Sequence, residues 1–154
     1  MNLILHNFFR SSTSYRVRAA LNLKGLSYDY AAYALRKGET RTADYLSLNP
    51  QGLVPTLEVN GQPLTQSLAI LEWLDETHPT PPLLPTDALD RARVRALAHT
   101  IALDIHPLNN LRVLFCIRDV FNASEADQAD WFRHWVAQGF TALETQLARD
   151  PQTG

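Results

Sequence analysis

The stretch FFRSSTSYRVRAALNLKG, residues 8–25, joins the end of a predicted strand to a predicted helix. Four hydroxyl side chains in a row, at residues 11–14, are typical of a helix start, because their oxygens accept hydrogen bonds from the first helical N–H groups. The apolar residues of 17–23 follow, and the helix ends at Lys24-Gly25. An apolar run over residues 2–6, before this stretch, is long enough for a buried strand.

The mixture of strands and helices continues to about residue 77. We expect a second strand over 28–33, a polar loop over 36–43 and a short helix over 43–48, ended by Asn49-Pro50. Extended runs at 56–59 and 62–65 flank Asn60-Gly61, a dipeptide that favours a tight hairpin turn. A helix over 67–77 completes an order that predicts a small mixed sheet with helices on both faces.

Prolines then divide the chain. Four prolines within residues 78–85 predict a stiff linker over 79–86, between a first domain over 1–78 and a helical domain over 87–154. Apolar residues recur at helical spacing as far as Phe115, with a kink expected at Pro107, and residues 124–127 have a capping-box pattern at the start of a last helix. Two helices cannot enclose a core, so the helical domain either packs tightly on the first domain or is incomplete here. If the chain ends at Gly154, we expect it to be poorly stable.

Composition excludes several classes of function. The 154 residues carry a formal net charge of −2, which argues against nucleic-acid and anionic-membrane partners. The single cysteine, Cys116, excludes an internal disulfide, and the five scattered histidines lack metal-ligand spacing, so we expect no metal site. No apolar stretch is long enough to span a membrane and the N-terminus does not look like a signal peptide, so a cytoplasmic, reducing setting is expected.

Two segments of the first domain could bind a ligand. Hydroxyls at a helix start can bind an anion or donate to a thiolate, although plain capping also explains one of them. Arg10, in the loop before this helix, is a candidate ligand, whereas Arg16 and Arg18 are interpreted as solvated helix charges. The four hydroxyl residues are Ser11, Ser12, Thr13 and Ser14.

The ends of the predicted hairpin offer further candidates. Val54-Pro55 precedes it, either as a simple strand opening or as a cis peptide that exposes the Val54 backbone to a bound peptide. Gln66 and Ser67 follow it, and Ser67 is either a plain helix cap or, with Gln66, a site for a ligand carboxylate.

A third polar cluster interrupts the long helical run of the second domain. His106, Asn110 and Arg112 gather around the proline at position 107. An isolated histidine on a helix is more often structural than functional, but the combination at a proline is a candidate site.

Three segments together closely resemble the zeta class of glutathione transferases: FFRSSTSYRVRAALNLKG, LNPQGLVPTLEVNGQPLTQSLAILEWL and HPLNNLRVL. The resemblance covers nearly the whole chain. It implies a thioredoxin-like N-terminal domain followed by an all-helical C-terminal domain, a homodimer, and glutathione as cofactor. Two departures are visible: Thr13 stands where the family often has cysteine, and family chains continue through several more helices.

The resemblance also assigns roles. Ser11 matches the serine beside the glutathione sulfur, with Ser12 and Thr13 next to it, and the hydroxyl of Ser14 completes the cluster. Val54 matches the residue whose backbone pairs with the glutathione cysteine, and Pro55 the cis-proline. The other matches are Gln66 and Ser67 at the γ-glutamyl end, and His106, Asn110 and Arg112 lining the cleft. We expect Ser14, His106 and Asn110 to contact glutathione as well.

The implied reaction converts a cis diketo acid, maleylacetoacetate, into its trans isomer by thiolate addition, bond rotation and elimination. Such a substrate carries carboxylates, for which Arg10 and Arg112 are the candidates because guanidinium binds carboxylate with two hydrogen bonds. Three alternatives remain: a maleylpyruvate isomerase, a broader glutathione transferase or dehalogenase of small α-halo acids, and a glutathione-fold binding module without turnover.

Overall fold

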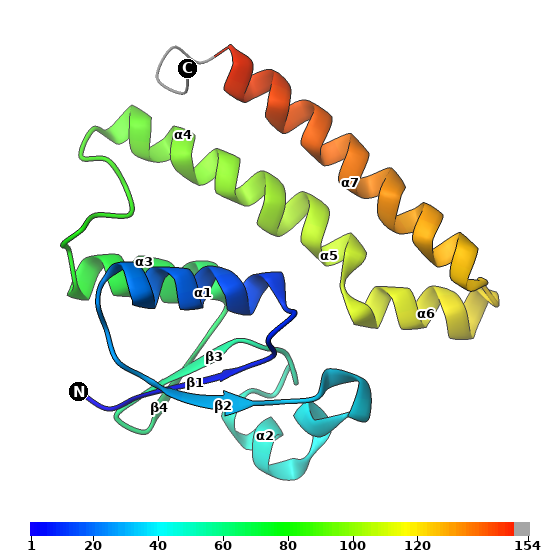
Figure 1. Cartoon of the computed structure of the whole chain (residues 1–154), viewed down its shortest axis with the longest axis horizontal. Helices are drawn as coiled ribbons and strands as arrows, with labels where there is room; N and C mark the ends of the chain where they lie inside the picture. The colour runs from blue at the N-terminus through cyan, green and yellow to red at the C-terminus, as the bar shows by residue number, and fades with distance from the viewer. Residues whose placement is uncertain (150–154) are drawn as a thin grey trace. The chain divides into compact units, whose positions relative to one another are not determined.

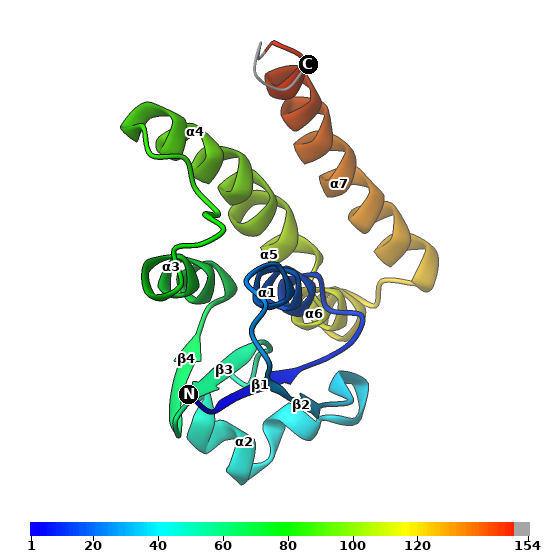
Figure 2. The same cartoon turned by 60° about the vertical axis from the view of Figure 1, so that its left-hand side comes forward.

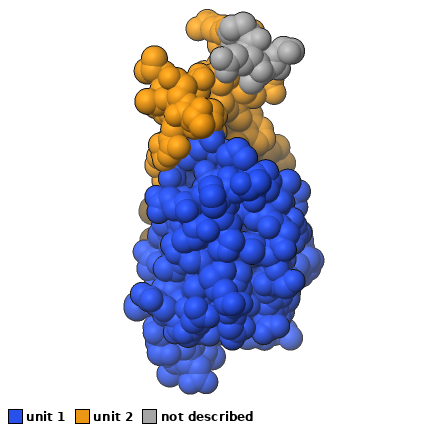
Figure 3. Space-filling model, turned by 90° about the vertical axis from the view of Figure 1, so that its left-hand side faces the viewer, with its two compact units in different colours: residues 1–84 blue, residues 85–154 orange. Residues whose placement is uncertain are grey.

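The computed structural model of the chain describes residues 1–149. The chain forms two compact units, residues 1–84 and residues 85–154, shown in blue and orange in Figure 3. The division falls inside the proline-rich segment that contains Pro79, Pro81, Pro82 and Pro85. Of the helical region predicted over 87–154, residues 150–154 lie outside the described part.

The first unit is built on one mixed sheet. Its strands lie in the order β2-β1-β3-β4, with β1 parallel to β2 and antiparallel to β3, and β3 antiparallel to β4. Helices α1 and α3 cover one face and α2 lies on the other (Figures 1 and 2), as the order of predicted elements indicated. The elements are β1 (Leu3–Asn7), α1 (Ser12–Leu23), β2 (Asp29–Ala32), α2 (Ala43–Leu48), β3 (Thr56–Val59), β4 (Gln62–Thr65) and α3 (Ser67–Thr77).

The core of this unit lies between the sheet and the two helices on its covered face. Leu5 of β1 pairs directly with Leu57 of β3, and both side chains are fully buried. Burying a leucine side chain stabilises the folded state by roughly 1.5–3 kcal/mol. The cluster comprises Leu3, Leu5, Val17, Ala20, Leu21, Leu57, Ile70 and Leu74.

The predicted hairpin between β3 and β4 is confirmed. Asn60 and Gly61 have φ values of 49° and 85°, and both must be positive in the turn that suits the twist of a two-residue hairpin. The Asn60 side-chain oxygen also accepts a hydrogen bond of 2.8 Å from the Asn2 backbone N–H, which ties the turn to the start of β1.

The segment predicted as a polar loop over 36–43 is more regular than expected. It forms two 3₁₀ turns, η1 (Leu35–Lys37) and η2 (Glu39–Arg41), followed directly by α2. The Glu39 carboxylate accepts a 2.6 Å hydrogen bond from the Ala34 N–H, and the Thr40 side chain is buried. Such short turns depend on individual hydrogen bonds and lack an apolar periodicity that would predict them.

A buried lysine joins the end of α1 to the proline-rich segment. The Lys24 ammonium donates to the Asp75 carboxylate at 3.0 Å and to the backbone carbonyls of His78 and Pro81 at 2.5 and 2.8 Å. Asp75 in turn accepts a 2.8 Å hydrogen bond from the Leu83 N–H. Burial alone would raise the pKa of Asp75, but the hydrogen bonds from Leu83 and Lys24 outweigh it and hold this pKa below its ordinary value of 3.8.

This carboxylate makes the stability of the protein depend on pH. Because the folded pKa of Asp75 lies below the unfolded one, its contribution is present above 3.8 and is lost as the pH falls through the folded value. We expect the difference in unfolding free energy between the wild type and Asp75→Asn to shrink between about pH 5 and pH 3. Urea titrations along this range measure it, with the exposed Asp29→Asn as control; a constant difference would contradict the expectation.

The second unit contains only helices among its described residues. They are α4 (Ala88–His99), the π-helical segment η3 (Thr100–Ile105), α5 (His106–Asn109), α6 (Leu111–Phe121) and α7 (Glu125–Ala148). The prediction of one long helix with a kink at Pro107 is therefore wrong in detail. The helix widens before Pro107, which cannot donate a backbone hydrogen bond, and then breaks at Asn110, whose backbone is extended with ψ 160°.

The last helix begins as predicted. Ser124 and Asp127 form a reciprocal capping box, in which each side chain accepts a hydrogen bond from the backbone N–H of the other. Further along α7, Gly139 lies so close to Ile105 of η3 that a Cβ atom at position 139 would overlap its side chain. None of the described helices is long and apolar enough to cross a membrane.

Candidate functional site

The start of α1 is linked by hydrogen bonds to the segment that precedes β3. Ser11 is the residue that caps α1, and its Oγ accepts a 3.2 Å hydrogen bond from the Ser14 N–H. Ser11 Oγ also lies 2.8 Å from Thr13 Oγ1, and Thr13 Oγ1 donates to the Val54 carbonyl at 3.1 Å. The structure therefore brings together residues that are more than forty positions apart in the sequence.

The direction of these bonds follows from the protons available. A hydroxyl has one hydrogen, and a carbonyl can only accept. Since the Thr13 hydrogen points to the Val54 carbonyl, the hydrogen between Ser11 and Thr13 belongs to Ser11. The two interpretations of the hydroxyl cluster are thus compatible, because Ser11 caps the helix with its oxygen and still has a hydrogen that can turn toward a ligand.

The other two hydroxyls of the cluster differ from each other. Ser12 is exposed, at the first position of α1. Ser14 is fully buried, and its Oγ accepts a long, 3.5 Å hydrogen bond from the Phe8 N–H. This burial does not favour the predicted contact of Ser14 with the cofactor. A helix turns by about 100° per residue, so four consecutive hydroxyls cannot all face one ligand.

The Val54-Pro55 peptide bond is cis, as the resemblance led us to expect. Tyr45 of α2 and Asn49, which follows this helix, hold the residue before Val54. The Tyr45 hydroxyl donates to the Leu53 carbonyl at 2.6 Å, and the Asn49 amide donates to the same oxygen at 2.8 Å. Burial raises the pKa of Tyr45, so this phenol stays protonated and keeps its hydrogen for the carbonyl. A second cis bond, Thr80-Pro81, was not predicted.

The start of α3 forms the other end of the candidate site. The cap position belongs to Gln66, with φ 67° and no capping hydrogen bond from its side chain, so the interpretation of Ser67 as a plain helix cap is wrong. The Gln66 amide donates to the Gln51 side-chain oxygen at 2.9 Å. Ser67 is buried, with 8% of its surface exposed, and its Oγ accepts a 3.4 Å hydrogen bond from Arg16.

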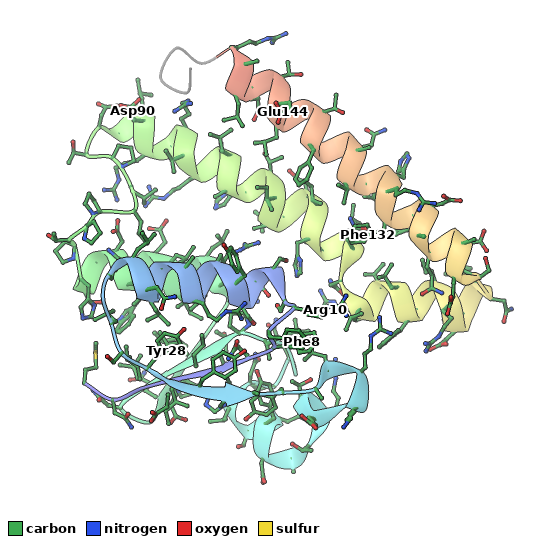
Figure 4. The ribbon with its side chains drawn as sticks, in the orientation of Figure 1. Phe8, Arg10, Tyr28, Asp90, Phe132 and Glu144 are labelled. Carbon is green, nitrogen blue, oxygen red and sulfur yellow. The ribbon has the colours of Figure 1, made fainter. Side chains whose placement is uncertain are left out.

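The three arginines near α1 have different surroundings. Arg10 is exposed in the loop between β1 and α1, near Phe8 (Figure 4). Arg16 is half-buried, and burial lowers its pKa. Arg18 donates to the Asn7 side-chain oxygen at 2.8 Å and to the Phe9 carbonyl at 3.0 Å. The interpretation of Arg16 and Arg18 as solvated helix charges is therefore wrong.

Sequence reasoning missed Arg16, although a pattern was available to find it. Thr13, Arg16 and Ala20 are spaced by three and four residues, so they share one face of α1. Ala20 is buried on that face and Thr13 reaches the Val54 carbonyl. A charged residue between two inward-facing positions is expected to be partly buried, and not solvated like an ordinary surface charge. No such pattern could have identified Gln51, the hydrogen-bond partner of Gln66, because it lies in a turn.

The candidates of the second unit lie at the break between α5 and α6. Asn110 caps α6: its side-chain oxygen accepts from the Arg112 and Val113 N–H groups at 3.1 and 3.3 Å, and its amide donates to the Pro107 carbonyl at 2.9 Å. Both polar groups of Asn110 therefore serve the backbone, which does not favour its predicted contact with a cofactor. His106 opens α5, and Arg112 is exposed in the first turn of α6.

The charge around Arg112 is suited to an anion. The first turn of α6 contains no acidic residue, so the guanidinium adds to the positive end of the helix dipole without a carboxylate to offset it. Among the described residues, no group of three histidine, cysteine or acidic side chains could bind a metal ion.

Comparison with known proteins places this geometry in a family. Residues 10–77 match the glutathione S-transferase N-terminal domain. The maleylacetoacetate isomerase of Pseudomonas aeruginosa is 48% identical over 149 residues, which is 95% of this chain and 69% of that protein.

Two solved structures extend the match to the fold. A holo maleylpyruvate isomerase, described as a bacterial glutathione S-transferase of the zeta class, is 52% identical, with a TM-score of 0.96 over 98% of this chain and 71% of its own. A maleylacetoacetate isomerase of Methylobacterium extorquens with bound malonate and glutathione is 40% identical, with a TM-score of 0.94 and the same coverage. The chain therefore belongs to the glutathione S-transferases, in the zeta class that contains the maleylacetoacetate and maleylpyruvate isomerases.

Proposed function

We propose that this chain is a glutathione-dependent isomerase that converts maleylacetoacetate to fumarylacetoacetate. The observation that carries the proposal is the hydrogen-bonded chain from Ser11 through Thr13 to the Val54 carbonyl, at the start of a helix. Its relatives include proteins named for the same reaction, and one was solved with glutathione. The residues of the first unit fit this cofactor, because they offer hydroxyl donors, a helix start and a partly exposed Val54 beside a cis-proline.

The chemistry divides between cofactor and protein. Glutathione, when bound, supplies a thiolate that adds to the conjugated double bond, so that the bond can rotate before elimination restores it as trans. Ser11 keeps that sulfur ionised by turning its hydrogen from Thr13 toward the sulfur. The positive end of the α1 dipole also favours the ionised form. The Val54 backbone, next to Pro55, pairs with the central residue of the cofactor, and Gln66 and Ser67 bind its γ-glutamyl end. His106 remains a proposed contact from the helical unit.

The substrate carboxylates require positive charge, which we assign to Arg10 and Arg112. Both side chains are exposed. We expect Arg112→Met to raise the KM for the acid by roughly 10- to 100-fold, the equivalent of about 1.5–3 kcal/mol for a hydrogen bond to a charged group. The KM for glutathione should stay nearly unchanged.

Steady-state kinetics with either ligand varied measure this effect. The matched control is Arg118→Met, which removes an exposed arginine from the same helix whose partner is its neighbour Asp119. Equal losses for acid and glutathione would place Arg112 at the cofactor instead, and no loss for either would remove it from the site.

A second candidate substrate is maleylpyruvate, the shorter acid, because a zeta-class relative at 52% identity is a maleylpyruvate isomerase. Ultraviolet assays of cis-to-trans conversion on both acids, with and without glutathione, test the proposal. We expect glutathione-dependent turnover, with a higher kcat/KM for maleylacetoacetate. The reverse preference would select maleylpyruvate. Turnover of small α-halo acids alone would make the chain a dehalogenase, and glutathione binding without any turnover would make it a binding module.

The proposal includes a cellular location and an oligomeric state. A cofactor thiol must remain reduced, so we place the protein in the cytoplasm. We propose a homodimer because the zeta-class resemblance implies one.

A further inference from the structure

Arg16 is a charged residue that burial has partly removed from solvent. Its side chain is half-buried on α1, and its hydrogen bond from Nη1 to Ser67 Oγ is long at 3.4 Å. Burial is the cause of its lowered pKa, and no carboxylate of the described residues offsets that shift. Removing a charge from water without a compensating anion is unfavourable, so this arrangement gives the unliganded fold little stability.

The contact between Arg16 and Ser67 has only one possible direction. A guanidinium has donors and no acceptor, so Ser67 Oγ must accept from it. The one hydrogen of the Ser67 hydroxyl is then directed away from Arg16 and can be donated to a ligand. Ser67 is more than nine-tenths buried and begins α3, where the first backbone N–H groups lack helical partners.

We propose that Arg16 is a positioning residue that orients the Ser67 hydroxyl to donate to the γ-glutamyl carboxylate of glutathione. This inference rests on the proposed function, which assigns that end of the cofactor to Gln66 and Ser67. Arg16 supplies the positive charge behind the hydroxyl, and the carboxylate supplies the negative charge that the half-buried guanidinium lacks. The charge also strengthens the serine as a donor, because hydrogen bonds in a chain polarise one another.

A positioning role and a structural role predict opposite outcomes for Arg16→Met. Methionine fills similar space without charge, so the unfolding free energy should be unchanged or higher if Arg16 serves the ligand. Binding of glutathione should weaken by roughly 10- to 100-fold, the range for a hydrogen bond to a charged group. A structural role would instead lower the stability and weaken every ligand alike.

The decisive experiment changes the ligand as well as the protein. Calorimetry gives the Kd of glutathione and of its analogue in which the γ-glutamyl carboxylate is replaced by a carboxamide. In the wild type we expect the amide to bind roughly 10- to 100-fold more weakly, and in Arg16→Met we expect the two ligands to bind with nearly equal Kd. In turnover, the KM for glutathione should rise while kcat stays close to the wild-type value.

Three controls make the result specific. Lys37→Met removes an exposed positive charge from the same unit and should leave the ratio of the two Kd values unchanged. Arg16→Lys should restore part of the preference for the carboxylate, because it restores the charge. Ser67→Ala should abolish most of the effect of Arg16→Met in the double variant. An acid-to-amide ratio that is the same in Arg16→Met as in the wild type overturns the inference, whereas a wild type that binds no glutathione overturns the proposed function.

Discussion

Replacing Ser11 by alanine should raise the pKa of the bound glutathione thiol and lower kcat/KM by about 10²- to 10³-fold, the usual cost of losing one preorganised donor at a reacting atom. The Ser11 hydrogen can leave its present acceptor, Thr13 Oγ1, without loss to the backbone, since Thr13 keeps its own bond to the Val54 carbonyl. In Ser11→Ala, the dipole and the N–H groups of α1 still stabilise the thiolate, but the hydroxyl no longer does.

Two substitutions separate this role from helix capping. Ser11 Oγ accepts from the Ser14 N–H, so Ser11→Ala should also cost about 1 kcal/mol of stability, whereas Ser11→Gly should cost only a few tenths. Both variants should lose the same activity and show the same thiol pKa in an ultraviolet titration of the thiolate. Ser47→Ala, which removes an exposed hydroxyl from α2, is the matched control. An unchanged titration and rate would exclude Ser11 and leave Ser12 as the next candidate.

Replacing Lys24 by methionine should lower the unfolding free energy by about 3–5 kcal/mol, the range for removing one partner of a buried ion pair. The Lys24 side chain has no solvent exposure, and its ammonium serves the Asp75 carboxylate and two backbone carbonyls. Methionine leaves those acceptors without their donor. The end of α1 and the proline-rich segment would then lose the bonds that join them.

Urea unfolding measures this loss, and Lys37→Met provides a surface lysine for comparison. The double variant Lys24→Met with Asp75→Leu should recover part of the stability, because an apolar pair can replace a buried ion pair of similar volume. A loss below about 1 kcal/mol for Lys24→Met, within the range of a surface ion pair, would show that the network contributes no more than exposed pairs do.

The fold of the first unit could be predicted because its patterns are local. The hydroxyl cluster at the start of α1 and Asn60-Gly61 before β4 each act over a few residues. The zeta-class resemblance correctly supplied the thioredoxin-like fold and the helical second unit. The break at Asn110 could not be predicted, because apolar spacing continues through it. What ends the helix is a side chain that caps α6 and binds the Pro107 carbonyl at once.

The candidate site could be predicted in position more than in detail. The sequence places Ser11, Val54 and Ser67 at element ends, and the fold brings Ser11 to Val54 through Thr13. The sequence does not show which way each side chain faces, so it cannot distinguish the buried Ser14 from its neighbours or identify the contact of Arg16 with Ser67. Those differences depend on packing between α1 and α3, which single-residue patterns do not record.

The close approach of α7 to η3 has an evolutionary consequence. Position 139 has no room for a Cβ atom because the Ile105 side chain occupies that space, while Ile105 is itself the most buried described residue of its unit. Substitutions at the two positions are therefore not independent. A larger residue at 139 needs a smaller one at 105 or a shift of α7. In homologues, the two positions should covary, with glycine at 139 accompanying a branched residue at 105 and alanine accompanying a shorter one.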